Sequence, residues 1–100
     1  GILREKLGKK AYETGVLYMK MEEYESAKMS FQVVIDLYYD TGIIHKAHQG
    51  MVQALAKNRE IDEALALLND HEMDLMGEGL YGDAQETIQN VQKIIAKEQQ

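Results

Sequence analysis

The sequence predicts an all-α fold in one domain spanning residues 1–100, and three observations support that prediction. Apolar residues recur at spacings of three and four along most of the chain, which is the period of an α-helix. No segment alternates apolar and polar residues over a useful length, so we place no strand. Hydrophobic residues make up 45% of the chain, a share that suits a packed core and argues against disorder.

Five stretches show the helical period: 3–20, 23–39, 43–57, 61–76 and 82–97. Proline is absent, so glycine and short polar residues mark the breaks between them. The clearest are the turn cluster Asp40-Thr41-Gly42 and the segment Gly77-Glu78-Gly79. Because short connections join antiparallel neighbours, the sequence predicts two antiparallel helix hairpins followed by a C-terminal helix.

The two predicted hairpins repeat each other. Tyr24-Glu25-Ser26-Ala27, followed by Phe31, matches Ile61-Asp62-Glu63-Ala64, followed by Leu68, at an offset of 37 residues. Upstream, the pair Gly15 and Tyr18 corresponds to Val52 and Leu55 at the same offset. A period in the thirties with two helices per unit is typical of an α-solenoid.

With these residues the chain resembles the tetratricopeptide-repeat (TPR) family. The family pattern sets a small residue and a tyrosine in the first helix, then an aromatic, an alanine and a large apolar residue in the second. The first repeat fills these places with Gly15, Tyr18, Tyr24, Ala27 and Phe31. The second keeps Ala64 and the apolar positions and has Val52 in place of the glycine. The usual proline at the repeat end is missing, and Tyr39 stands near that position.

The resemblance implies a TPR-like α-solenoid with repeat one at 8–41, repeat two at 45–76 and the C-terminal helix at 82–97. It also implies a non-catalytic scaffold that binds another protein and needs no cofactor. The C-terminal helix has two readings, either a cap that closes the end of the solenoid or an element that docks onto another copy or another protein. Because two repeats bury little core, a self-associating unit that dimerises through its exposed repeat ends stays open as an alternative.

A narrower resemblance concerns TPR proteins of the bacterial cell envelope, such as the TPR lipoprotein of the outer-membrane β-barrel assembly machinery. The segment Ile35-Asp36-Leu37-Tyr38-Tyr39-Asp40-Thr41 is similar to the turn that ends the second helix in that group, and 84–97 is similar to the lipoprotein's last helix. This implies a role in outer-membrane protein assembly in the periplasm or at the outer membrane. A cytoplasmic TPR adaptor or regulator remains the alternative.

In TPR proteins the first helix of each repeat lines a concave groove, and the resemblance implies which residues face it. They are Lys9, Tyr12, Val16 and Lys20 in the first repeat and Lys46, Gln49, Gln53 and Lys57 in the second. Four lysines on one face of an otherwise acidic chain indicate a groove for an acidic or carboxylate-bearing peptide. The alternative is that the lysines only keep an exposed face hydrated.

Charge, hydropathy and the absence of known motifs argue against several other functions. The net charge of −6 disfavours nucleic-acid binding, and the short apolar runs predict no membrane-spanning segment. His45, His48 and His71 are the candidate metal ligands, but ordinary helical histidines explain them better, so we expect no metal site. No phosphate-binding loop, nucleophile elbow or zinc-protease motif occurs, and we therefore expect no enzyme.

Overall fold

The computed structural model describes all 100 residues and is all-helical, with 81% of them in helices and no strand. The prediction of an all-α fold is therefore confirmed. Helices lie at α1 (Ile2–Lys20), α2 (Tyr24–Leu37), α3 (Ile44–Lys57), α4 (Ile61–Asp70), α5 (Glu72–Gly77) and α6 (Tyr81–Glu98). No helix combines the length and the apolar character needed to cross a bilayer.

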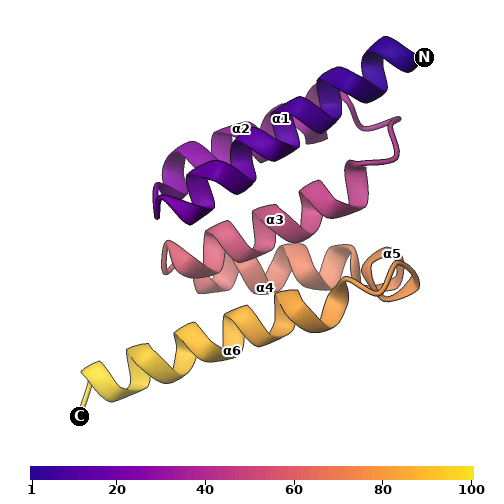
Figure 1. Ribbon diagram of the computed structural model, residues 1–100. Coiled ribbons are helices and arrows are strands. Elements are labelled where there is room, and N and C mark those ends of the chain that lie inside the picture. Colours follow the sequence, from indigo (N-terminus) through magenta and orange to yellow (C-terminus); the bar gives the residue numbers. More distant parts are fainter.

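The helices form an elongated body of 52 × 28 × 17 Å. Each of α1, α2 and α3 packs against the next helix along the chain, and α3 also packs against α6. Figure 1 shows the two ends of the chain at opposite corners, with α1 at one edge of the body and α6 at the other. The helix α3 therefore lies in the middle and carries most of the packing.

One prediction needs correction: the fourth helix does not run unbroken from 61 to 76. It is interrupted at His71, where φ is −113° and ψ is 19°, and a six-residue helix, α5, follows. Asparagine, aspartate and histidine have weak helix propensity, and they stand together at positions 69–71. Beyond the interruption, Leu75 of α5 is fully buried in the core shared with α6.

The core has two parts. The first surrounds Phe31 of α2, which packs with Ala27, Met51 and Ala54. A Cβ built on Gly15 of α1 or on Gly50 of α3 would lie within 2.5 to 2.9 Å of the Phe31 ring. The ring is therefore clamped between two helix backbones, which only glycine allows to approach so closely.

The second part of the core gathers around α6. Ala84, Ile88 and Val91 of that helix pack with buried residues of α3, α4 and α5, namely Val52, Ala56, Ala64, Leu68 and Leu75. Leu55 and Leu67 touch both parts of the core, and they join the two halves of the molecule.

Three helix-ending turns share one backbone geometry. Glu22, Arg59 and Gly79 adopt positive φ values of 59°, 66° and 72°. In each turn the next N–H donates to a carbonyl five residues earlier, at 2.9, 2.9 and 2.8 Å respectively. This bond pattern with a left-handed residue is the Schellman ending of an α-helix. The chain thus turns in the same way before α2, α4 and α6.

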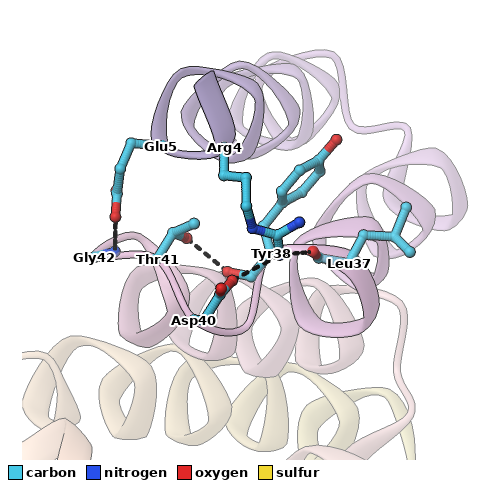
Figure 2. Close-up of polar contacts among 7 residues, drawn as sticks. All are labelled: Arg4, Glu5, Leu37, Tyr38, Asp40, Thr41 and Gly42. Atoms are coloured by element: carbon cyan, nitrogen blue, oxygen red, sulfur yellow. Dashed lines mark hydrogen bonds and ion pairs between the residues drawn. The ribbon is translucent and has the colours of Figure 1, made fainter. Parts of the chain in front are cut away.

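The connection between α2 and α3 is held by the start of α1. The Arg4 guanidinium donates to the Leu37 carbonyl and to Asp40 Oδ1, the latter at 2.7 Å, and lies over the Tyr38 ring (Figure 2). The Glu5 carboxylate accepts from the Gly42 N–H at 3.1 Å. The Arg4 hydrogen bond lowers the pKa of Asp40 below its usual value. These contacts fix the register of α1 against the α2–α3 connection.

Candidate partner-binding surface

The eight predicted groove residues lie on two neighbouring helices, α1 and α3, at equivalent positions 37 residues apart. The four lysines, Lys9, Lys20, Lys46 and Lys57, are exposed and form no ion pair, whereas Arg4, Lys28 and Arg59 do. The other four predicted groove residues are half-buried, namely Tyr12, Val16, Gln49 and Gln53. The structure therefore leaves the lysine ammonium groups available to an acidic partner.

The α1 half of this surface is open. Tyr12 and Val16 are half-buried and pack against the core around Phe31, with the Tyr12 and Phe31 ring centroids 5.7 Å apart. Partial burial raises the pKa of the Tyr12 hydroxyl. Beside these two residues lies a depression of about 420 Å³ that Glu13, Leu17 and Lys20 also line. Apolar contact next to an ammonium group is thus available on α1.

The α3 half is occupied by the chain itself. Gln49 Nε2 donates to the Leu80 carbonyl at 3.0 Å, and Gln53 Nε2 donates to Thr87 Oγ1 at 3.2 Å. Leu80 is the residue immediately before α6 and Thr87 lies in the first half of that helix, so these amides hold α6 against α3. Of the predicted residues on α3, Lys46 and Lys57 are exposed and the two glutamines are engaged.

The far end of α6 is fixed by a charged pair. The Arg59 guanidinium makes a bidentate pair of hydrogen bonds to the Glu98 carboxylate, in which Nη1 donates to Oε1 and Nη2 donates to Oε2 at 2.8 Å. This pairing lowers the pKa of Glu98 and raises that of Arg59. Both ends of α6 thus contact the hairpin formed by α3 and α4. Between these two ends, the apolar face of α6 is buried against that hairpin.

Sequence reasoning missed a third occurrence of the repeat pattern. Tyr81, Ala84 and Ile88 of α6 stand after their turn as Tyr24, Ala27 and Phe31 stand after theirs. Both alanines are fully buried, and Ile88 and Phe31 are nearly so. The signal was present in the sequence, but the helix before this turn is α5, six residues long, and its shortness hid the match.

The second feature that sequence reasoning missed is a stacked histidine pair. His48 of α3 and His71 at the α4–α5 break have ring centroids 3.7 Å apart with planes 17° apart. Burial, then the charges of His71 and His45, lower the pKa of His48 to about 4. His45 Nε2 lies 3.7 Å from Glu78 Oε1. No three histidine, aspartate or glutamate side chains are placed together to hold a metal ion.

A third feature is a groove between α2 and α4, of about 540 Å³, whose floor is formed by α3. Met51 and Leu55 form that floor, with Met29 on one wall and Leu67 on the other. No sequence motif indicated it, because its lining residues come from three helices. It shares α3 with the predicted lysine face, but none of its lining residues is one of the eight predicted groove residues.

Comparison of the chain with family models, with curated proteins and with solved structures found no match. The interpretation of the surface therefore rests on its own residues.

Proposed function

We propose that the chain is a non-catalytic protein-interaction module of the TPR kind that binds an acidic segment of another protein. The observation that carries the proposal is the open α1 face, where unpaired Lys9 and Lys20 flank Tyr12 and Val16. An acidic segment crossing this face would meet ammonium groups at both ends and apolar side chains between them. Lys46 and Lys57 extend the positive charge along α3.

Three structural features support the TPR assignment within this proposal. The chain turns by the same backbone geometry before α2, α4 and α6. The alanines that follow these turns, Ala27, Ala64 and Ala84, are all fully buried. Phe31 fills the space that Gly15 and Gly50 leave between α1 and α3. A bacterial envelope scaffold, with an outer-membrane assembly subunit as partner, is the setting that the sequence resemblance favours.

The test is a pull-down from bacterial envelope extract, read by mass spectrometry, with three baits. These are the wild-type chain, a variant with Lys9, Lys46 and Lys57 replaced by alanine, and a matched control with Lys10, Lys93 and Lys97 replaced by alanine. We expect the wild type and the control to retain the same partner and the groove variant to lose it. Equal capture by all three baits would show that the lysine face is not the binding surface.

A second candidate function is self-association through the outer face of α1. Met51 and Ala54 of α3 are buried against α2, whereas their equivalents 37 residues earlier, Thr14 and Leu17, are exposed. Leu7 on the same helix is also 41% exposed and Leu17 is 57% exposed. Sedimentation at increasing concentration tests this candidate, and Leu17→Glu would shift any dimer to monomer. A wild-type chain that stays monomeric at all concentrations would exclude it.

A further inference from the structure

The groove between α2 and α4 has an apolar interior. Met51 and Leu55 form its floor, Leu67 forms part of the α4 wall, and Met29 stands on the α2 wall with 71% of its surface exposed. A methionine left in water beside such a groove gains contact when a ligand covers it, and its unbranched side chain adapts to the ligand's shape.

The groove has an acidic rim. Glu25, Glu63 and Asp70 line it, and its one cation, Lys28, is already bound. Lys28 Nζ lies 2.6 Å from Glu60 Oε1 and 3.1 Å from Glu25 Oε1. Glu63 and Asp70 have no cationic partner among the ion pairs of the chain. The rim therefore presents uncompensated negative charge around an apolar floor.

We propose that this groove is a second docking site, for a basic segment of a partner protein that inserts one long apolar side chain between α2 and α4. The apolar side chain would lie over Met51 and Leu55, and flanking lysines or arginines would face Glu63 and Asp70. The commitment to a basic occupant follows from charge complementarity, because an acidic segment would be repelled at this rim. The site is distinct from the lysine face of α1 and does not depend on the function proposed for it.

The experiment starts from a phage library of random twelve-residue peptides, panned on the immobilised chain. We expect the enriched peptides to carry lysine or arginine within a few positions of leucine, methionine or phenylalanine. Failure to enrich any peptide, or enrichment of acidic peptides that bind at Met29 and Met51, would overturn the proposal.

The binding position is read by NMR on a chain labelled with ¹³C in its methionine methyl groups, titrated with the best enriched peptide. The six methionines report separately, and only Met29 and Met51 line the groove. We expect these two signals to move and those of Met73 and Met76 to stay. Movement of the Met29 signal on concentrating the chain without peptide would identify a second copy as the occupant, and would overturn the proposal.

Two matched pairs of variants test the chemistry. Asp70→Lys should weaken binding of the peptide by about tenfold or more, because it reverses a charge on the rim of the groove. Glu86→Lys on α6 should leave the affinity for the peptide unchanged. Met29→Ser should weaken binding, and Met73→Ser, at a methionine that is 86% exposed, should not. All four positions are exposed, so folding is preserved. Equal binding by Asp70→Lys and Glu86→Lys would overturn the charge argument.

Discussion

At the scale of single residues, Phe31 decides how closely the first three helices approach. Its ring is buried to 1% exposure between backbone at Gly15 and backbone at Gly50. The repeat pattern predicted a small residue at Gly15, but it gave no indication of Gly50. That position has no counterpart in the repeat pattern, and its role appears only when α3 is placed against α2.

Gly50→Ala should destabilise the chain by about 1–3 kcal/mol, because the new Cβ would lie 2.6 Å from Phe31 Cζ and the ring must move. Urea unfolding measures the change. Gly82→Ala is the control, since a Cβ there meets nothing within 4 Å and alanine favours the helix. Equal midpoints for Gly50→Ala and the wild type would contradict the tight packing around Phe31.

His48 makes stability depend on pH. Its pKa in the folded chain is about 4, against an ordinary value of 6.5, because burial and the neighbouring His71 and His45 disfavour its protonated form. As pH falls below 6.5 the unfolded chain takes up a proton that the folded chain does not, so the free energy of unfolding falls until pH reaches about 4.

Thermal melting between pH 7.5 and 5 should therefore show a larger loss of stability for the wild type than for His48→Gln. The interval stops above the range in which carboxylates such as Asp40 and Glu98, whose pKa values are lowered, begin to contribute. Parallel loss in both proteins would show that His48 is not the group responsible.

At the scale of elements, helical periodicity predicted five helical stretches. Four of them correspond to single helices, and the stretch 61–76 is divided into α4 and α5. Two of the three left-handed turn residues are not glycine, yet the predicted helix ends beside them, at 20, 57 and 61, agree with the structure. Glu22 and Arg59 adopt positive φ despite the steric cost to an L side chain, and neither residue is a turn signal in sequence. The break at His71 was missed because the apolar spacing continues across it to Leu75.

The shared turn geometry predicts opposite effects at two of these sites. Gly79→Ala should lower the free energy of unfolding by about 1 kcal/mol, because alanine would be forced to a φ near +72°. Glu22→Gly should raise it by a few tenths to about 1 kcal/mol by removing the same cost. Urea midpoints of the two variants test this, and a destabilised Glu22→Gly would contradict it.

At the scale of the whole molecule, the sequence left two readings of α6 open, a cap on the chain's own helices or an element that docks elsewhere, and the structure shows α6 packed against α3 and α4. Its buried stripe is visible in the sequence, but the stripe does not say which surface receives it. The receiving side of α3 includes Gln49 and Gln53, and polar residues give no sequence signal for helix contact. For the same reason the predicted site changed in extent, with its α1 half open and the two amides of its α3 half used inside the chain.

The packing of α6 predicts a contrast between two isoleucines of the same helix. Ile88 is 2% exposed and Ile94 is 50% exposed. Ile88→Ala should cost about 2–5 kcal/mol through the cavity it leaves, while Ile94→Ala should cost well under half as much. Denaturant unfolding measures both. Similar small losses would mean that α6 is not seated on α3 and α4 in solution.

The two leucines that touch both parts of the core have a consequence for how the chain melts. Leu55 and Leu67 connect the cluster around Phe31 to the cluster around Ile88, and they also line the groove between α2 and α4. Calorimetry should therefore give a single transition whose van't Hoff and calorimetric enthalpies agree, because neither half can lose its packing alone. Shortening both leucines would uncouple the two halves and make the van't Hoff enthalpy smaller than the calorimetric enthalpy. A molecule bound in the groove would contact both halves and keep them unfolding together.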